Sequence, residues 1–252
     1  MTAPFFLLEH GTAMPEVGGA LVLDGPEGRH AVSVRRIGVG ETVLLGDGAG
    51  TVVTAEATAV VGRDRLEARA VSVVVHPAPA PRVVVVQALP KGERGDLSVE
   101  LLTEVGVDAV VPWSAARSVA VWKGEKASRG TEKWRTTARE AAKQSRRAFV
   151  PEVRALASTA DVVALLRSTV AGGGTALVLH EAASLRMASL KPSTSGDVVL
   201  VVGPEGGIAD DELAAFADAG ALTARLGPSV LRTSTAGTVA AAVVLAAVGR
   251  WD

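Results

Sequence analysis

The chain has 252 residues, of which 48% are hydrophobic, and a formal net charge of −1 at pH 7. That length allows one large domain or two moderate ones, with ample apolar residues for a core. The sequence has no cysteine, which excludes disulfides, thiol catalysis and cysteine-ligated metal sites. It shows no signal peptide and no apolar run long enough to span a bilayer, so we expect a cytoplasmic protein with no membrane association. The near-neutral charge counts mildly against a nucleic-acid partner, although local clusters of charge decide such contacts.

The first 75 residues or so read as β-structure. Short apolar or alternating runs, separated by glycine and aspartate turns, predict strands over 5–8, 20–23, 42–45, 52–60 and 66–75. Regular short strands of this kind are typical of a small barrel. Between them, residues 27–36 predict a short helix that ends in Arg35 and Arg36. These two arginines are either a solvated helix end or an RNA contact.

A proline-rich stretch marks the expected domain boundary. Three prolines fall within residues 76–81, and they resist both helix and sheet. We therefore expect a first domain over 1–76, a linker over 77–81 and a second domain over 82–252.

The second domain opens with the pattern of a βαβ unit. A buried strand over 82–89 is followed by a loop with Lys91, a helix for which Asp96 is a plausible N-cap, and a strand over 109–112. Lys91 is either a substrate-facing cation or an ordinary loop lysine.

A basic helix follows a polar segment at 124–130 that we expect to be flexible. The helix begins at Thr131 and runs to about Arg147. A stripe of four cations recurs at every fourth position on it, Arg135, Arg139, Lys143 and Arg147. Such a stripe is usually a solvated face, but it also suits a phosphate backbone.

Two glycine-bearing loops dominate the last fifty residues. A buried strand over 198–202 ends in Gly203-Pro204-Glu205-Gly206-Gly207, and a strand over 222–226 runs into a second loop over 227–237. A helix begins near Asp210 between them, and an apolar helix ends the chain. Ligands bind beyond the carboxyl ends of parallel strands, and glycine allows close approach of the main chain. The spacing is neither a phosphate loop nor GxGxxG. The pair therefore predicts a ligand site that could read an adenine edge, although each loop alone would be only a tight turn.

The segments 202–207 and 226–236 strongly resemble the signature of the SPOUT methyltransferases. One family among these enzymes has segments that resemble four further parts of the chain: Leu89-Pro90-Lys91-Gly92, 104–107, a strand with Arg117 and Ser118, and 140–147. This is the RsmE family, the 16S ribosomal RNA uridine N3-methyltransferases. The resemblance implies an α/β fold: a trefoil-knotted, parallel-sheet domain preceded by a PUA-like β-barrel. It also implies the cofactor S-adenosylmethionine, a homodimer, 16S rRNA within the small ribosomal subunit as partner, and no metal.

The resemblance also implies the residues of the site. Arg232 is the candidate catalytic cation near the target base. The family commonly has Glu where this chain has Ser234, so we assign no carboxylate base in this loop. The expected cofactor contacts are Leu179, His180, Glu181, Val202, Gly203, Pro204, Glu205, Gly206, Gly207, Leu226, Gly227, Leu231, Thr233, Ser234 and Ala236. The expected RNA contacts are Arg35, Arg36, Lys91, Arg117, Arg135, Arg139, Lys143 and Arg147.

Two alternatives remain open at this point. The chain could be a related SPOUT enzyme that acts on transfer RNA or on the ribose 2′-hydroxyl. It could also be an RNA-binding or ribosome-assembly protein that keeps the fold without catalysis. The first loop's glycines and Leu231-Arg232-Thr233 argue against the second alternative.

Overall fold

The computed structural model describes residues 3–9 and 11–251. Their contacts divide the chain into two units. The first comprises the residues up to Ala78 together with Ala142–Val150, and the second comprises Pro79–Ala141 and the residues from Pro151 onward. The sequence did not indicate that 142–150 would belong with the N-terminal residues.

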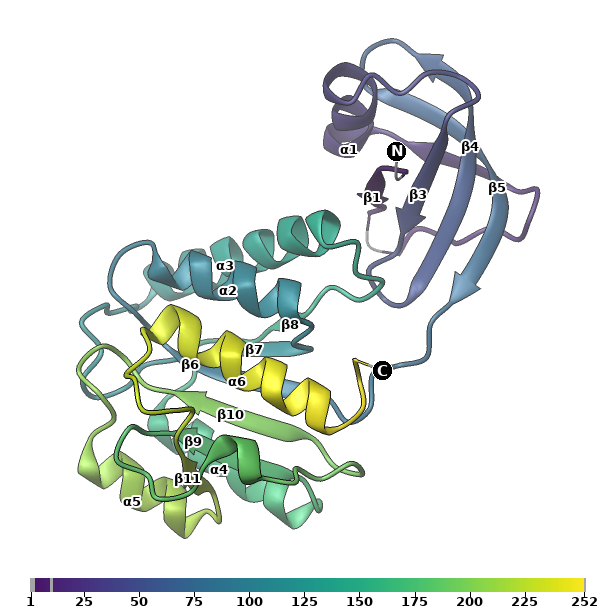
Figure 1. The fold of residues 1–252 in the computed structure, drawn as a ribbon. Coiled ribbons are helices and arrows are strands. Elements are labelled where there is room, and N and C mark those ends of the chain that lie inside the picture. Colours follow the sequence, from purple (N-terminus) through teal and green to yellow (C-terminus); the bar gives the residue numbers. More distant parts are fainter. Residues whose placement is uncertain (1–2, 10, 252) are drawn as a thin grey trace. The chain divides into compact units, whose positions relative to one another are not determined.

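The first unit is built on a five-stranded sheet with the order β1-β3-β4-β5-β2, in which only the β1–β3 pair is parallel. Alternate residues of these strands, such as Val43, Leu45 and Leu66, are buried in one core. The pairing of β4 with β5 shifts register twice, and such irregularities bend a strand, as Figure 1 shows for this pair. The strands are β1 (Phe5–Leu7), β2 (Ala20–Leu23), β3 (Thr42–Gly46), β4 (Thr51–Val61) and β5 (Arg65–Val75).

The helix predicted over 27–36 is present, with shifted bounds. α1 (Gly25–Arg29) continues directly into the π-helical turn η1 (His30–Val34). Arg35 closes the turn, and Arg36 leaves it in a left-handed conformation with φ +56°. Both arginine side chains are exposed.

The second unit is built on a six-stranded parallel sheet with the order β11-β9-β10-β6-β7-β8. β6, β7 and β10 are buried at every position, which explains their continuous runs of Val, Leu and Ala rather than an alternating pattern. The strands are β6 (Val83–Ala88), β7 (Ala109–Trp113), β8 (Glu152–Val153), β9 (Thr175–Leu179), β10 (Val198–Val202) and β11 (Leu222–Ala224).

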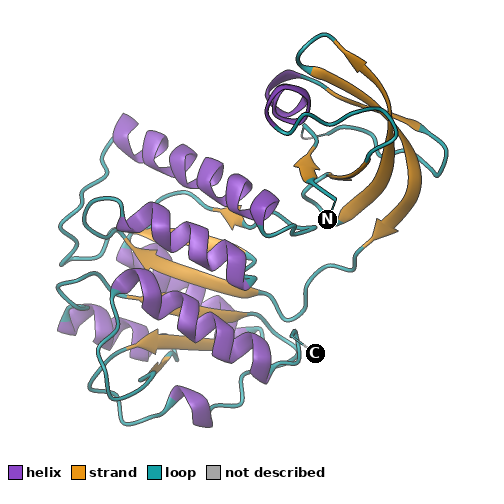
Figure 2. Cartoon of the chain, turned by 45° about the horizontal axis from the view of Figure 1, so that its top comes forward, coloured by secondary structure: helices purple, strands orange, loops and turns teal. Residues whose placement is uncertain are grey.

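Helices cover both faces of this sheet (Figure 2). Val83 and Val85 face a core that includes Leu102, Trp134 and Val244, so α2, α3 and α6 lie on that side. The opposite face packs against α4 and α5. The helices are α2 (Arg94–Val105), α3 (Glu125–Gln144), α4 (Thr159–Ala171), α5 (Asp210–Asp218) and α6 (Thr233–Ala247), with a 3-10 turn, η2 (Met187–Ser189).

Two local predictions are wrong near the start of this unit. α2 begins at Arg94 with Glu93 as its N-cap residue, so Asp96 is not the cap. The Asp96 carboxylate instead pairs with the Lys133 ammonium of α3 at 2.5 Å. The segment 114–124, which we expected to contain a strand, forms turns and bends.

α3 also differs from its prediction at both ends. It begins at Glu125, six residues early, and includes Gly130. A Cβ at Gly130 would lie 2.7 Å from two atoms of the Trp122 ring, so glycine stands there because the indole covers the helix backbone. The helix ends at Gln144, and Arg146 is left-handed with φ +55°, so Arg147 lies beyond the helical stripe.

α6 is fastened near the C-terminal end by a buried ion pair. Arg250 Nη2 donates to Asp108 Oδ1 at 3.1 Å, and Nη1 donates to the main-chain carbonyl of Pro81 at 3.2 Å. The same carboxylate accepts the Val83 N–H at 2.8 Å, so the end of the chain is bound to the start of β6. Within the described residues, no helix is both long and apolar enough to cross a membrane.

Candidate functional site

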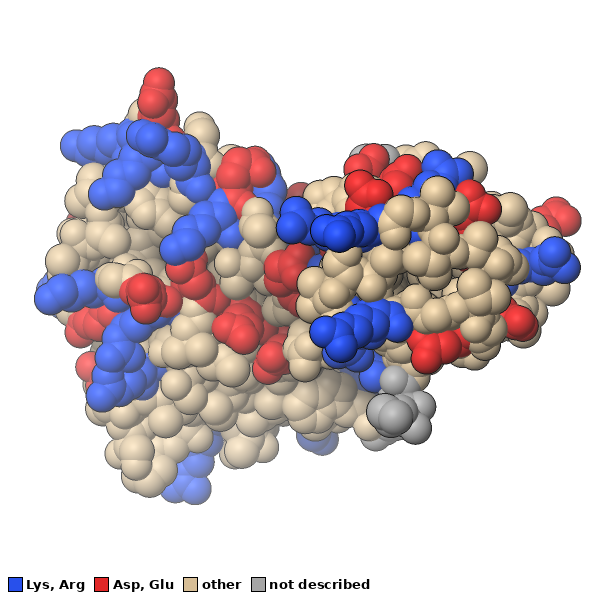
Figure 3. All heavy atoms as spheres, turned by 90° about the horizontal axis from the view of Figure 1, so that it is seen from above, with Lys and Arg blue, Asp and Glu red and all other residues tan. Residues whose placement is uncertain are grey.

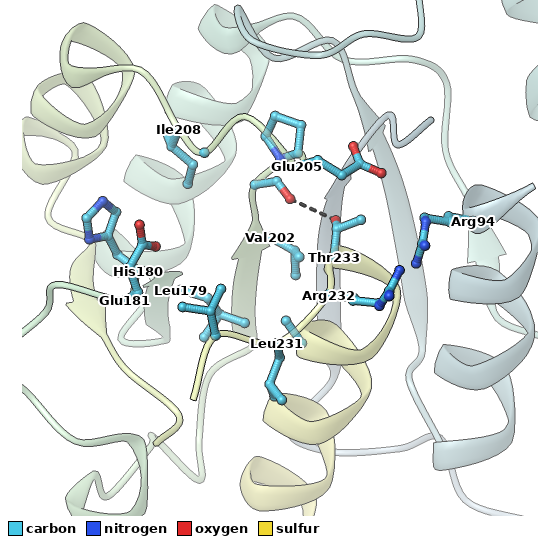
Figure 4. Close-up of a pocket in the computed structure, with 15 residues that line it drawn as sticks. Arg94, Leu179, His180, Glu181, Val202, Glu205, Ile208, Leu231, Arg232 and Thr233 are labelled. Carbon is cyan, nitrogen blue, oxygen red and sulfur yellow. Dashed lines mark hydrogen bonds between the residues drawn. The ribbon is translucent and has the colours of Figure 1, made fainter. Parts of the chain in front are cut away.

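A pocket of about 360 Å³ opens in the second unit at the carboxyl ends of β9 and β10 (Figure 4). The loop that follows β10 forms one wall, and the residues that lead into α6 form another. Parallel strands that end side by side leave such a crevice between their loops. The pocket is lined by Arg94, Leu179, His180, Glu181, Val202, Gly203, Pro204, Glu205, Gly207, Ile208, Val230, Leu231, Arg232, Thr233 and Ala236.

The glycines after β10 allow this loop to fold tightly. A Cβ at Gly203 would lie 2.7 Å from Ile208 Cγ1, so a side chain there would displace a wall of the pocket. Gly207 has φ +73°, a conformation that favours glycine. The first loop is therefore more than a generic turn, because its shape depends on both residues.

A buried carboxylate holds the far end of the same loop. Glu212, in the first turn of α5, is only 3% exposed and accepts three hydrogen bonds. Its donors are the Ala209 N–H at 3.2 Å, the Ala116 N–H at 2.9 Å and the Thr159 hydroxyl at 2.8 Å. These bonds join the loop after β10 to α4 and to the segment after β7.

A second buried network joins the loop to α6. The Thr233 hydroxyl donates to the Gly203 carbonyl at 2.8 Å, drawn as a dashed line in Figure 4. It also accepts from Gln87 Nε2 at 2.8 Å, and the same amide donates to the Ala88 carbonyl at 3.1 Å. One hydroxyl therefore fixes the distance between β6, the loop after β10 and the first turn of α6.

Positive charge gathers at one end of the pocket. The guanidinium groups of Arg94 and Arg232 converge there, with the Glu205 carboxylate nearby (Figure 4). Glu205 Oε1 accepts the Lys91 N–H at 3.1 Å. Among the described residues, neither guanidinium has a hydrogen-bond or ion-pair partner. Two unpaired cations beside each other suit a ligand that is anionic or becomes so.

The other end of the pocket differs in character. His180 and Glu181 follow β9 there, and His180 Nδ1 accepts the Ala182 N–H at 3.2 Å. Leu179, Val202, Ile208 and Leu231 lie between this end and the two arginines. The middle of the pocket is therefore apolar, as a flat aromatic ligand would require. No cluster of three or more potential metal ligands occurs within 3–9 and 11–251.

The structure brings most of the predicted site residues together. Arg232 and eleven predicted cofactor contacts line the pocket. Leu226 and Gly227 line a smaller recess of about 80 Å³ that shares Leu179 and Leu231 with it. Gly206 and Ser234 line neither cavity; Ser234 is 3% exposed within α6.

Sequence reasoning missed Arg94, Ile208 and Val230 at this pocket. Arg94 had a usable signal, because it stands three residues after Lys91, directly after the loop that follows β6. The misplaced start of α2 hid it. Ile208 and Val230 are apolar residues in loops, and nothing in their spacing marks them.

The predicted RNA contacts fall into two groups. Lys91 and Arg117 lie beside the pocket, where Arg117 Nη1 donates to the Ile208 carbonyl at 3.3 Å. Arg135 donates to the Val153 carbonyl at 3.1 Å, and the Lys143 ammonium pairs with Glu27 and is 9% exposed. Arg139 and Arg147 are half-buried, and Arg35 and Arg36 are exposed.

Comparison with known proteins defines the class. Residues 76–245 match the model of the RNA methyltransferase domain, and residues 23–71 match that of the RNA methyltransferase PUA domain. With the parallel sheet and its pocket, these matches confirm the predicted fold class. The protein is an RNA methyltransferase with a SPOUT-type domain preceded by a PUA-like domain.

Individual relatives identify the family within this class of proteins. "Ribosomal RNA small subunit methyltransferase E" of Mycobacterium bovis is 48% identical over 252 residues, covering 100% of this chain and 95% of the relative. The protein of the same name from Bacillus subtilis is 29% identical over 85% of each chain. The structure of the Neisseria gonorrhoeae protein of that name, bound to S-adenosylmethionine, has a TM-score of 0.83 at 26% identity, covering 97% of this chain and 98% of that one. The chain belongs to the family of ribosomal RNA small subunit methyltransferase E.

Proposed function

We propose that the protein methylates N3 of a specific uridine in 16S rRNA of the small ribosomal subunit, with S-adenosylmethionine as methyl donor. One observation carries the proposal most directly: an apolar pocket between two glycine-bearing loops ends in two unpaired guanidinium groups. The names of the relatives support ribosomal RNA as the substrate. Structures from Neisseria gonorrhoeae and Legionella pneumophila, both with bound S-adenosylmethionine, support the cofactor.

The residues present fit that cofactor. Leu179, Val202, Ile208 and Leu231 offer apolar contacts to a flat adenine ring, and the closely folded main chain of both loops offers amide and carbonyl groups to its edge. A Cβ at Gly203 would lie 2.7 Å from Ile208 Cγ1, so glycine there keeps Ile208 in place as a wall for the ring. The bound sulfonium would supply an activated methyl group.

The protein's own task is to align the uridine and to favour the loss of its N3 proton. Holding two reactants in line replaces an encounter in solution and accounts for a large share of many rate enhancements. Transfer of the N3 proton to water leaves negative charge on the uracil ring, and N3 then takes the methyl group from the sulfonium, which leaves as the neutral thioether. Arg232, with Arg94 beside it, would stabilise that charge. Because N3 lies on the Watson–Crick edge, the target must be unpaired or flipped out of a helix.

The assembly and location of the protein are part of the proposal. We expect a trefoil knot around the cofactor pocket, a homodimer and a cytoplasmic enzyme. Val230 lines the pocket and is 78% exposed, which suits burial by a second copy. Arg35, Arg36, Arg139 and Arg147 would contact the RNA together with Lys91 and Arg117.

Nucleoside mass spectrometry of small-subunit RNA tests the function. A deletion strain should lose 3-methyluridine, and the wild-type gene should restore it. Arg232→Ala should fail to restore it. Arg167→Ala, which changes an exposed arginine of α4 on the opposite face of the sheet, should restore it fully. Persistence of 3-methyluridine after deletion would contradict the proposal, and loss of another methylated nucleoside would identify the alternative substrate.

A further inference from the structure

A second pocket, of about 280 Å³, lies in the same unit between the start of α2 and the first half of α3. Trp122 and Trp134 form its aromatic wall, and Lys126, Arg129 and Lys133 line it as well. We call it the Trp122 pocket. None of its residues lines the proposed cofactor pocket.

The indole of Trp122 is held in place on two sides. It packs on the backbone of Gly130, where a Cβ would lie 2.7 Å from ring atoms. Its ring also meets that of Trp134 edge to face, with centroids 5.2 Å apart and an interplanar angle of 72°. Trp134 is 2% exposed, whereas Trp122 is only partly buried. A fixed, partly exposed indole in a cavity offers a ready surface on which a flat ring can stack.

The cations beside this wall are largely available to a ligand. Lys126 and Arg129 are exposed, and the pairing of Arg129 with Glu125 is loose, at 3.7 Å with side-chain exposures of 78% and 91%. Lys133 is bound to Asp96, and this hydrogen bond raises the pKa of its ammonium, so Lys133 carries its charge at neutral pH. Figure 3 shows Lys and Arg side chains gathered at the left end of this unit's viewed face, with acidic side chains among them.

The two pockets meet at one segment, the loop after β6 and the first turn of α2. Arg94 lines the cofactor pocket, whereas the next two residues, Gly95 and Asp96, line the Trp122 pocket. Pro90 and Gly92 also line the Trp122 pocket, while the N–H of Lys91 between them donates to Glu205. A single RNA strand that crosses this loop could therefore reach both pockets.

We propose that the Trp122 pocket binds an unpaired nucleotide that flanks the target uridine. Its base stacks on Trp122, and its phosphate lies near Lys126 and Arg129. Stacking on aromatic side chains beside a cationic groove is how proteins hold single-stranded RNA without reading its sequence. The inference rests on the proposed function, because it assigns the second pocket to the same RNA substrate.

Fluorescence anisotropy with a fluorescein-labelled, single-stranded oligouridylate tests the stacking. Trp122→Leu, which keeps an apolar side chain without an aromatic face, should weaken binding about five- to 150-fold. Trp122→Phe should bind nearly as wild type does. The double variant Lys126→Gln/Arg129→Gln changes only exposed side chains, and it should lower the slope of log K against log salt by about 1.4.

Controls separate this inference from the proposed function. S-adenosylmethionine binding by calorimetry should be the same in all variants, which also shows that Trp122→Leu is folded. With small subunits from the deletion strain, Trp122→Leu should raise KM and leave kcat nearly unchanged. If wild-type protein methylates those subunits but the leucine and glutamine variants bind oligouridylate as tightly as wild type, the pocket does not hold RNA. A defect confined to assembled subunits would point to a ribosomal protein and would also overturn the inference. Failure of the wild type to methylate would count against the function itself.

Discussion

The most direct test of the cofactor pocket's architecture is Thr233→Val. Valine keeps the shape of threonine but removes the hydroxyl that joins Gly203 and Gln87, each at 2.8 Å. The lost bond to Gly203 costs about 1 kcal/mol, since that carbonyl lies beside the pocket and can be hydrated. Gln87 is 0% exposed, so its amide loses a partner that water cannot replace, at roughly 1–3 kcal/mol, eased by its remaining bond to Ala88. We expect a total of about 2–3 kcal/mol, together with weaker binding of S-adenosylmethionine.

Thr238→Val is the matched control in the same helix. The Thr238 hydroxyl is buried, yet it has no hydrogen-bond partner among the residues that the structure describes. Valine there should change the free energy of unfolding by less than about 1 kcal/mol and could stabilise the protein. Urea unfolding and calorimetry with S-adenosylmethionine measure both effects. Equal destabilisation by the two substitutions would refute the role given to the Thr233 network.

Three further predictions concern residues outside that network. Arg94→Gln should lower kcat/KM for small subunits at least tenfold and leave cofactor affinity nearly unchanged, because its guanidinium lies beside that of Arg232, at the end of the pocket where we expect the uracil. Normal turnover by the variant would exclude this role for Arg94. Gly130→Ala should displace Trp122 and shift the tryptophan emission to longer wavelength, although alanine gains about 1 kcal/mol in helix propensity. An unchanged spectrum with a more stable protein would contradict the contact between Trp122 and the backbone of Gly130. Glu152→Gln should cost less than about 1 kcal/mol, with the full cost present above about pH 4.5. Burial alone would raise the pKa of Glu152, but hydrogen bonds and charge from Arg154 and Arg82 outweigh it and hold that pKa below 4.5. The difference in free energy of unfolding between wild type and variant should therefore disappear as the pH falls. A constant difference down to about pH 3 would be inconsistent with this.

Much of the fold was predictable from local pattern. Buried parallel strands show as continuous apolar runs, and most strands of the first unit alternate, so every strand except β8, for which none was predicted, could be found within a few residues. The capping of α4 by Ser158 was also predictable, because Ser158 and Asp161 bond each other's main chain, a local arrangement.

The errors arose where distant residues decide local structure. Nothing within 124–130 shows that Trp122 will cover Gly130 and let α3 start early. Asp96 was mistaken for a helix cap because its actual partner, Lys133, stands 37 positions away in the chain, where local sequence gives no sign of the pairing. The site was predictable from its glycine loops and Leu231-Arg232-Thr233. Arg94 was missed because it lines the pocket from the first residue of α2, which begins earlier than the sequence indicated.

The two ends of α6 are both bound to β6 or its flanks, through Thr233 and Gln87 at one end and through Arg250, Asp108 and Pro81 at the other. β6 lies inside the sheet, between β10 and β7, but α6, which covers it, follows every other described helix and strand along the chain. Domains made early in synthesis can fold while the rest is translated. This unit must wait until α6 and Arg250 have been made before both of these attachments can form. A chain terminated before α6 would therefore lack Thr233 and one wall of the pocket, even if the earlier strands and helices had folded.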